Sequence, residues 1–552
     1  MVNSVRFHIK LICAIILLTI LALTSCGVGA SQESNETSGQ STSHQYQPET
    51  ENEYYHATPA PETHLHVGQS TPQPANPLQQ PLTTQDLLDL AYTRKQSIFI
   101  PSTERLTQLT YGRPPSTFAL RFLSDFNLNP TTSEIFPTQD FIYDVQLYFD
   151  ILREVYGAYT FFGGDEIFLP ILDEILMELE EREYWYVTRV ERMIHSKLSP
   201  YIQDNHLRIG FHTFSSEYSM FASNRFFDKT EHGFRDRTNG LYVQEVVGHN
   251  IDEVFRFTAN QYGELSYTLV IVKSSDRIIE NNLVIYKCGE SENLRLQSID
   301  NSARPIYREP SLEFINGFPV VTINAMYLTY FIDEHVEKAN TFLSFVDKLR
   351  NEPAFIIDLR GNGGGSALLP SWWLYNLTGE VVPQNSLMLQ PLEFYYAFQQ
   401  EPPIPDSINY PPPRNDAWAQ RVARPFGDNH VIISMSDPDR ANTTVANDQI
   451  IIFLIGRHTA SAAEVFIDMA FNVENTLVIG QNTQGTLLMN FCFPNRFLPY
   501  TGLSFGLGTT LFVHADAHNF REGVGFAPDI WVPHNEDALL AALALLRNHF
   551  DE

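Results

Sequence analysis

The chain has 552 residues and a formal net charge of -29 at pH 7. This length is enough for two or three domains with a sizeable hydrophobic core. The acidic balance argues against a nucleic-acid partner and against docking on anionic lipid by charge.

The N-terminus has the features of a lipoprotein signal peptide. Arg6 and Lys10 precede an apolar run over 11–23. This run is shorter than the about 20 residues that a membrane span needs. The sequence LTSC at 23–26 follows and resembles a bacterial lipobox. It implies removal of residues 1–25 and lipidation of Cys26, so that a lipid anchor alone holds the protein at the cell membrane. The folded part would then face outside the cytoplasm, at the cell surface or in the periplasm.

Residues 26–83 are rich in Ser, Gln, Glu, Thr, Pro and His and poor in aliphatic side chains. Such a segment cannot bury enough apolar surface to offset the entropy lost on ordering. We predict a disordered tether between the anchor and the folded part.

Residues 84–212 carry apolar side chains at helical spacing and indicate an N-terminal helical domain. Pro170 is expected in the first turn of the second helix. The three apolar faces are Phe141, Val145, Phe149, Leu152 and Val155; Ile167, Leu172, Ile175, Leu176 and Leu179; and Val187, Val190, Met193, Ile194 and Leu198.

Residues 213–300 change character and predict a small β-rich module. Three stretches, 241–247, 266–272 and 282–286, are rich in β-branched and aromatic residues and are separated by turn residues.

Residues 451–470, IIFLIGRHTASAAEVFIDMA, predict a buried strand, a tight turn with Ser461, and a helix. Glu464 follows Ser461 by three residues, which is the spacing of a capping box. A plain N-cap is the structural explanation of Ser461 on this stretch alone. The same corner also suits an acyl-transfer nucleophile, because free N–H groups and the helix dipole favour the oxyanion that develops there.

Residues 354–366, AFIIDLRGNGGGS, predict a second buried strand that ends in a glycine loop before a helix over 367–375. Glycines let backbone N–H groups converge on a small anion. A dinucleotide-binding fingerprint fails on spacing, because its third glycine would fall at Ser366.

Four blocks occur in order: DLRGNGG at 358–364, TASAAE at 459–464, GQNTQG at 480–485 and EGVGFAPD at 522–529. Together they resemble the C-terminal processing (tail-specific) serine protease family over 301–552. The resemblance implies an α/β chain, α+β overall, with a crotonase/ClpP-like ββα protease core. It also implies that residues 213–300 are PDZ-like, in a degenerate form without a Gly-Leu-Gly-Phe-like carboxylate loop.

The resemblance assigns Ser461 as the nucleophile. The oxyanion hole would consist of the Ala462 N–H group and one from Gly363 or Gly364.

The chain departs from the family at the general base. Many members place a lysine where this chain has Thr486, and the last lysine here is Lys348. The tricorn-like branch uses a histidine on the strand matching 318–326, which here offers Asn324.

Three residues therefore stay open as the base. Glu464 is one helical turn after Ser461 but is also the capping-box partner. Glu522 lies in the fourth block but is also a candidate structural acid. His206 lies in an Asp-Asn-His sequence that resembles an Asp-x-His block of some family members. A carboxylate serves as a base only if burial raises its pKa.

No cofactor and no metal are expected. His514, Asp516 and His518 alternate as zinc ligands can on a strand, but no fourth ligand is evident. Cys288 and Cys492 remain after processing, and two buried thiols are preferred over a disulfide. A Pro-rich insertion over 376–447 is expected to be a long loop beside the substrate groove.

The sequence thus predicts a serine peptidase that hydrolyses peptide or protein substrates outside the cytoplasm. The alternatives are a catalytically inactive relative that binds peptides or envelope components, and a hydrolase of non-peptide esters. The sequence does not indicate the oligomeric state.

Overall fold

The computed structural model describes residues 83–95, 102–110, 133–215, 218–274, 281–299, 309–327, 332–394, 424–427, 430–433, 443–514 and 520–551. All of them belong to one compact unit. The expected signal peptide, Cys26 and nearly all of the expected tether lie outside the described residues. Within the described ranges, no helix is both long and apolar enough to cross a membrane.

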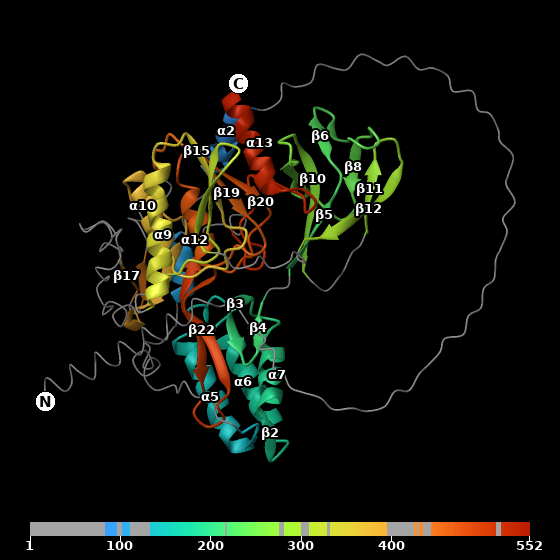
Figure 1. Cartoon of the computed structure of the whole chain (residues 1–552). Coiled ribbons are helices and arrows are strands. Elements are labelled where there is room, and N and C mark those ends of the chain that lie inside the picture. Colours follow the sequence, from blue (N-terminus) through green and yellow to red (C-terminus); the bar gives the residue numbers. More distant parts are fainter. Residues whose placement is uncertain are drawn as a thin grey trace, which may run out of the picture. The chain divides into compact units, whose positions relative to one another are not determined.

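The chain is mixed α/β, and a parallel stretch of sheet forms the centre of its C-terminal half (Figure 1). Neighbouring strands β14, β15, β19, β20 and β23 are parallel, and β13 adds an antiparallel edge. Their bounds are Ser311–Ile315 (β13), Phe318–Thr322 (β14), Ala354–Asp358 (β15), Ile450–Ile455 (β19), Thr476–Gly480 (β20) and Ile530–Trp531 (β23).

Helices cover both faces of this parallel sheet. Successive strand residues point to opposite faces. Accordingly, the even-numbered residues of β19 pack with α2 and α13, and the odd-numbered ones with α9, α10 and α12. Burial on both sides explains why the β15 and β19 sequences are continuously apolar. The helices are Thr84–Lys95 (α2), Asp333–Leu349 (α9), Leu368–Thr378 (α10), Ala462–Ala470 (α12) and Ala538–Asp551 (α13).

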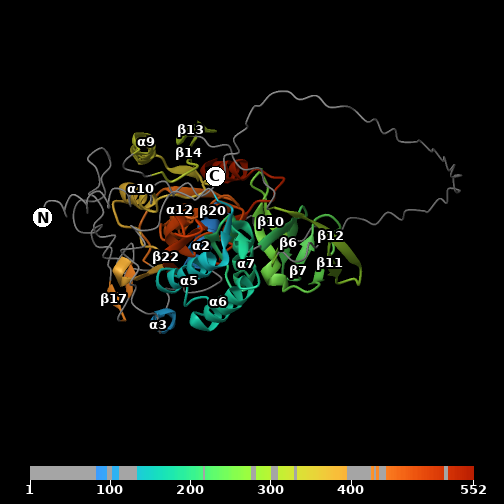
Figure 2. The same ribbon diagram turned by 90° about the horizontal axis from the view of Figure 1, so that it is seen from below.

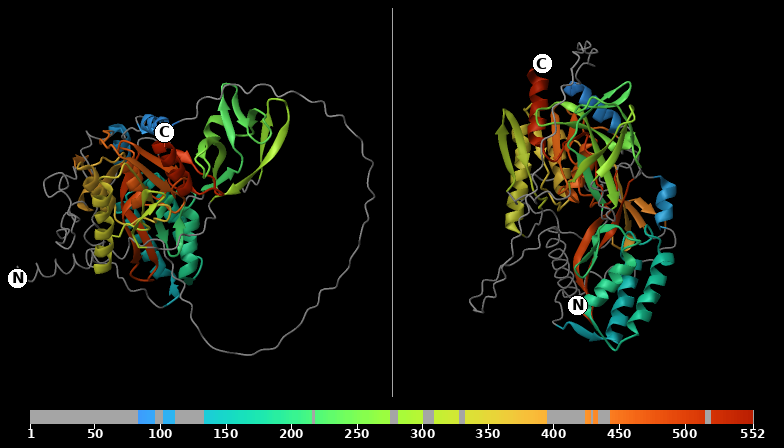
Figure 3. Two further views of the ribbon diagram at one scale, coloured as in Figure 1. Left: turned by 45° about the horizontal axis from the view of Figure 1, so that its top comes forward. Right: turned by 90° about the vertical axis from the view of Figure 1, so that its right-hand side faces the viewer.

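The three helices expected between residues 138 and 198 are present and lie beside one another (Figures 1 and 3). They are α5 (Thr138–Glu154), α6 (Asp165–Leu179) and α7 (Val187–Leu198). The expected apolar faces are buried, but not in a core of their own. They share one cluster with strands of the C-terminal half, because α5–α7 cover a second sheet. Shorter elements nearby are α3 (Thr103–Thr110), β1 (Ile135–Pro137) and β2 (Tyr184–Tyr186).

This second sheet has seven strands among the described residues and joins distant parts of the chain. Strands β3 and β4 come from the N-terminal half, and the other five come from the C-terminal half. They are Asp204–Ile209 (β3), His212–Phe214 (β4), Leu387–Pro391 (β16), Arg424–Phe426 (β17), His430–Ile433 (β18), Met489–Phe497 (β21) and Ser504–Val513 (β22).

Two expectations need correction. Helix α6 begins at Asp165, so Pro170 lies inside the helix and not in its first turn. The insertion over 376–447 is not only loop, because its described parts include β16, β17 and β18, which extend the second sheet. Its proline-rich stretch over 395–423 lies outside the described residues.

The β-rich module contains the three expected strand stretches (Figure 2). Strand β9 pairs in parallel with β23, and the Thr258 hydroxyl donates a hydrogen bond to the Trp531 carbonyl oxygen at 2.7 Å. The module therefore continues the central sheet. Its elements are Tyr218–Ser223 (β5), Phe227–Thr230 (β6), Gly233–Asp236 (β7), Val243–Val246 (β8), Ile251–Val254 (α8), Phe255–Ala259 (β9), Leu265–Ser274 (β10), Asn281–Tyr286 (β11) and Ser291–Ser298 (β12).

Candidate active site

Ser461 occupies the corner between β19 and α12, as the sequence predicts. Its backbone has φ 53° and ψ -118°. A side chain with a Cβ atom rarely adopts positive φ, and asparagine is the common exception. The other non-glycine residues with positive φ in the described ranges are both asparagines, Asn316 and Asn475. Ser461 is thus the strained residue whose type offers no local reason for the strain.

The glycine loop packs directly against this corner. A Cβ atom on Gly364 would lie 2.7 Å from the Ser461 Cβ atom and 3.1 Å from the Ala462 nitrogen. Such distances are too short for any side chain, so the loop can approach Ser461 only because position 364 is glycine. The neighbouring Gly365 is held by Met326, whose N–H group donates to the Gly364 carbonyl oxygen at 2.8 Å.

Two backbone N–H groups near Ser461 have no hydrogen-bond acceptor within the described ranges: those of Ala462 and Gly363. The Gly364 N–H group is different, because it donates to the Asn362 side-chain oxygen at 2.9 Å. Asn362 itself is buried and donates to the Ile323 carbonyl oxygen. Of the two expected glycines, Gly363 therefore keeps its donor available for an anion.

Glu464 is fully buried and accepts hydrogen bonds on both oxygens. Oε2 accepts from the N–H groups of Ser461 at 2.9 Å and Thr486 at 2.8 Å. Oε1 accepts from the Gly485 N–H group at 2.7 Å and the Thr483 hydroxyl at 2.6 Å. Burial raises the pKa of the Glu464 carboxyl, and these four donors oppose that rise. The carboxylate thus joins the serine corner to the 483–486 turn.

Glu522 is also buried and joins two further segments. Its Oε1 accepts from the Asn205 N–H group at 3.0 Å, and its Oε2 accepts from the N–H groups of Leu487 and Leu488. Burial, with a further contribution from the Asp204 charge, raises the pKa of Glu522 well above its usual value. Glu522 therefore fastens strand β3 beside the chain that follows the 483–486 turn.

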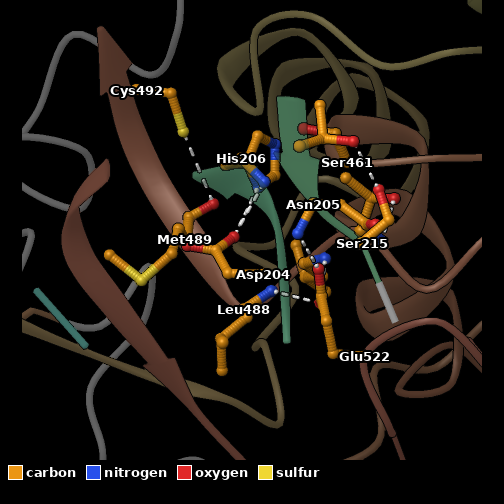
Figure 4. Close-up of polar contacts among 12 residues, drawn as sticks. Asp204, Asn205, His206, Ser215, Ser461, Leu488, Met489, Cys492 and Glu522 are labelled. Atoms are coloured by element: carbon orange, nitrogen blue, oxygen red, sulfur yellow. Dashed lines mark hydrogen bonds and ion pairs between the residues drawn. The ribbon is translucent and has the colours of Figure 1, made fainter. Parts of the chain in front are cut away.

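His206 lies on β3, next to Asn205 (Figure 4). Its side chain is only 9% exposed, and its Nδ1 atom lies 4.0 Å from the Asp204 Oδ1 atom. Burial lowers the pKa of His206 to about 4. The imidazole is therefore neutral at physiological pH and able to accept a proton.

A short chain of hydrogen bonds joins Ser461 to the residue beside His206. Glu464 binds Ser461 and Thr486, as described above. The Asn205 side-chain nitrogen donates to the Gly485 carbonyl oxygen at 2.7 Å and to the Thr486 hydroxyl at 3.1 Å. Thr486 stands where the family has its lysine, and here it supports the position of β3. The structure thus gathers Ser461, Glu464, Thr486, Asn205 and Glu522 into one hydrogen-bond network, and His206 is the residue that follows Asn205 on β3.

The other residues named from the sequence lie on other segments of the chain. Asn324 is half-buried on the segment between β14 and the glycine loop. His514 is buried and stacks on Phe520, while Asp516 and His518 lie outside the described residues. The described ranges contain no group of three side chains that could hold a metal ion. Cys288 and Cys492 are free thiols, but the expectation that both are buried is wrong, because Cys288 is exposed and Cys492 is only partly buried.

Sequence reasoning missed two supports of the network. The Arg457 guanidinium binds backbone carbonyl oxygens of Thr483, Gly523 and Val524, so it clamps the loops that carry Gly485 and Glu522. Tyr156 donates its hydroxyl to Asp204 at 2.7 Å. The alternation of Asp204 and His206 on one strand was a usable signal, since it puts both on one face. Tyr156, which follows the C-terminal end of α5, gave no signal, because only the tertiary fold brings this residue to β3.

Comparisons with known proteins point to peptidases. The model of peptidase family S41 matches residues 415–532, which is less than half of the chain. No curated protein matches. One similar solved structure is mature CPAF complexed with lactacystin, which is 14% identical, has a TM-score of 0.39, and is matched over 75% of this chain and 99% of that chain. The photosystem II D1 C-terminal processing protease is 12% identical, with a TM-score of 0.33 over 74% of this chain and 97% of that chain. The tricorn protease is 13% identical, with a TM-score of 0.33 over 75% of this chain and 37% of that chain. Because these scores are low, we base the function on the site and on the family match.

Proposed function

We propose that this chain is a serine-type peptidase with Ser461 as its nucleophile. The observation that carries the proposal is the strained backbone of Ser461 beside the unbonded N–H groups of Ala462 and Gly363. Strain of this kind persists only where the surrounding structure imposes it, and it concentrates at functional sites. A sharp strand-to-helix turn also exposes the nucleophile in other hydrolases. The match to peptidase family S41 supports the same reaction class.

In the proposed reaction, the Ser461 hydroxyl oxygen attacks the carbonyl carbon of a peptide bond, and its proton passes to the general base. The N–H groups of Ala462 and Gly363 donate to the oxyanion of the tetrahedral intermediate. When this intermediate collapses, the C–N bond breaks and the base returns the proton to the leaving amine. Water then hydrolyses the acyl-enzyme by the same route.

His206 is the base that the geometry supports best. Glu464 accepts four hydrogen bonds and Glu522 accepts three backbone N–H groups, which supports assigning both carboxylates a structural role in this proposal. His206 is buried and neutral, and its neighbour Asn205 belongs to the same hydrogen-bond network as Ser461. No hydrogen bond joins the described side chains of His206 and Ser461, but such bonds often form only when substrate binds.

We further propose that the enzyme is lipid-anchored through Cys26 and cleaves proteins outside the cytoplasm. The lipobox-like sequence LTSC at 23–26 supports this location. Metabolic labelling with an alkyne fatty acid tests it. The full chain should incorporate the lipid, and the Cys26→Ser variant should not.

The function itself is tested by labelling the folded full chain with a fluorophosphonate probe across a pH series. We expect labelling of the parent, no labelling of Ser461→Ala, and unchanged labelling of Ser344→Ala. Ser344 is the matched control, because its hydroxyl donates within helix α9 to the Thr341 carbonyl oxygen. His206→Gln should slow labelling by about 10²–10⁴-fold. If the folded parent chain is never labelled, the result would favour the alternative, a catalytically inactive relative that binds peptides or envelope components.

A further inference from the structure

Asp204 is an unusual neighbour for the proposed base, because it is a carboxylate with no exposed surface. Its Oδ2 atom accepts a hydrogen bond from the Tyr156 hydroxyl at 2.7 Å. Its Oδ1 atom accepts a hydrogen bond from the backbone N–H group of His206 at 2.8 Å. A buried carboxylate is costly unless such donors compensate for lost water. The carboxylate also accepts a hydrogen bond from the Leu207 backbone N–H group, at a point where the pairing of β3 with β4 is irregular.

The His206 ring faces this carboxylate. The dashed line in Figure 4 joins one ring nitrogen of His206 to Asp204, and that pair is Nδ1 and Oδ1 at 4.0 Å. Nδ1 is buried and has no hydrogen-bond partner within the described ranges. A modest rotation of the ring would let Nδ1–H donate to Asp204. That bond would leave the Nε2 lone pair for the proton of Ser461, because a neutral imidazole carries one N–H.

Asp204 is the buried acid with an oxygen close to the imidazole, at 4.0 Å from Nδ1. The oxygens of Glu522, the other buried acid nearby, accept the backbone N–H groups of Asn205, Leu487 and Leu488. Burial raises the pKa of Asp204 to about 6, so Asp204 is mostly ionised at pH 7. Burial, with a contribution from the Asp204 charge, raises the pKa of Glu522 well above its usual value. The carboxylate that faces the His206 ring, and so can stabilise its protonated form, is that of Asp204.

We propose that Asp204, held by the Tyr156 hydroxyl, is the positioning residue that sets the tautomer and orientation of His206. This inference rests on the proposed function of His206 as the base. Asp204 touches neither substrate nor Ser461, and it acts only through the imidazole. Tyr156 acts one step further away, since its hydroxyl keeps Asp204 ionised and aimed at the ring.

Two variants of the full chain separate positioning from mere structural support, with the rate of fluorophosphonate labelling against pH as the readout. Asp204→Asn should lower the plateau rate by about 10²–10⁴-fold, as loss of a tautomer-setting carboxylate does elsewhere. Its acid limb should move to lower pH, because His206 loses the charge that stabilises its cation. Tyr156→Phe should move the acid limb the opposite way, because a carboxylate that loses a donor binds its proton at higher pH.

Tyr148→Phe is the matched control. Tyr148 lies in α5, and Tyr156 follows the C-terminal end of this helix. The Tyr148 hydroxyl is buried and has no hydrogen-bond partner among the described residues. It should keep the parent rate and pH profile. The titratable groups that face Asp204 are Tyr148, Tyr156, His206 and Glu522. The two tyrosine variants change the surroundings of Asp204 without changing a residue of the loops around Ser461.

A second readout does not depend on catalysis. In NMR spectra of ¹⁵N-histidine-labelled protein, with the His206 signal assigned from His206→Gln, we expect the Nδ1–H tautomer in the parent and in Tyr148→Phe, but a reduced share in Asp204→Asn. A parent with the Nε2–H tautomer, or an unchanged tautomer in Asp204→Asn, would overturn the proposal. A parent that shows the Nδ1–H tautomer yet never labels would support the positioning and refute the peptidase function.

Discussion

At the scale of single residues, the backbone of Ser461 separates a nucleophile from an ordinary helix cap. An N-cap residue normally has a β-region backbone, which costs nothing. Ser461 instead has φ 53°, and the glycine loop packs against its Cβ atom at the corner. Residues in sparsely populated backbone regions cost about 1–3 kcal/mol each. The protein tolerates this cost at a serine that lies beside two unbonded N–H groups.

This strain makes a testable prediction about stability. Ser461→Gly should unfold at higher denaturant concentration than Ser461→Ala, by about 1–2 kcal/mol, because glycine adopts positive φ freely. Both variants should lack labelling. Chemical unfolding followed by circular dichroism measures the difference. At Ser344 in helix α9 the order should reverse, since glycine is about 1 kcal/mol worse than alanine inside a helix. The same order at both positions would count against strain at Ser461.

At the scale of elements, α12 is the organising helix, because its acids fix loops on two sides. Glu464, one turn into the helix, binds the turn that contains Thr483 and Thr486. Asp468, one turn later, accepts hydrogen bonds from Asn385 and Ser386, just before β16. Both carboxylates are buried, so each replaces water with protein donors. The helix thereby positions the serine corner relative to both sheets.

Glu464→Gln should destabilise the fold by about 2–5 kcal/mol. The glutamine side chain has one acceptor oxygen and a donor nitrogen, and that nitrogen would face N–H groups that themselves need acceptors. Urea unfolding of the parent and the variant measures this loss. Glu337→Gln, on the exposed face of α9, is the control and should change stability by less than about 0.5 kcal/mol. Equal stability of Glu464→Gln and the parent would contradict the described network.

Asp468 predicts a pH dependence of stability. Burial raises the pKa of Asp468 from 3.8 to about 6, so the folded state binds this proton more tightly than the unfolded state. The contribution of Asp468 is therefore largest below about pH 4 and is lost as the pH rises toward 6, by up to about 3 kcal/mol. Asp468→Asn should remove this part of the slope, as measured by unfolding free energies from pH 4 to 7. Asp333→Asn, at an exposed residue, should keep the parent slope.

At the scale of the whole molecule, the described residues from the two halves of the sequence share sheets and cores. The β-rich module continues the central sheet through β9 and β23, and β3 crosses into the second sheet beside β22. Helices α5–α7 bury their apolar faces against strands of the C-terminal half. A module joined by strand pairing has less freedom to move than one joined by a linker alone.

This continuity predicts that the module and the core lose structure together. Thr258→Val removes the hydroxyl that binds the Trp531 carbonyl oxygen and should cost about 1 kcal/mol. Hydrogen exchange followed by mass spectrometry should show faster exchange in β9, β10 and β23 alike. Thr341→Val, at a partly buried position of helix α9 away from these strands, is the control and should leave them unchanged. Faster exchange in β10 with no change in β23 would show that the module unfolds independently.

The sequence by itself determined the local elements around the site. The apolar run of β19, the corner at Ser461, the glycine loop and helices α5–α7 follow from residue spacing between near neighbours, and each is present at the predicted place. The capping-box spacing also identified the contact between Glu464 and the Ser461 N–H group. Short-range patterns predict such features because a few adjacent residues decide which backbone conformation buries apolar side chains and satisfies N–H groups.

Only the tertiary structure decided which distant residues meet at the corner. His206, Glu522 and Thr486 were separate candidates in the sequence. The pairing of β3 with the C-terminal strands brings Asn205, the neighbour of His206, into one hydrogen-bond network with Glu522 and Thr486. The choice between Gly363 and Gly364 depended on the Asn362 side chain, and Tyr156 became relevant only through its contact with Asp204. The physical reason is that long-range strand pairing and the burial of polar groups depend on the whole core, which no local spacing encodes.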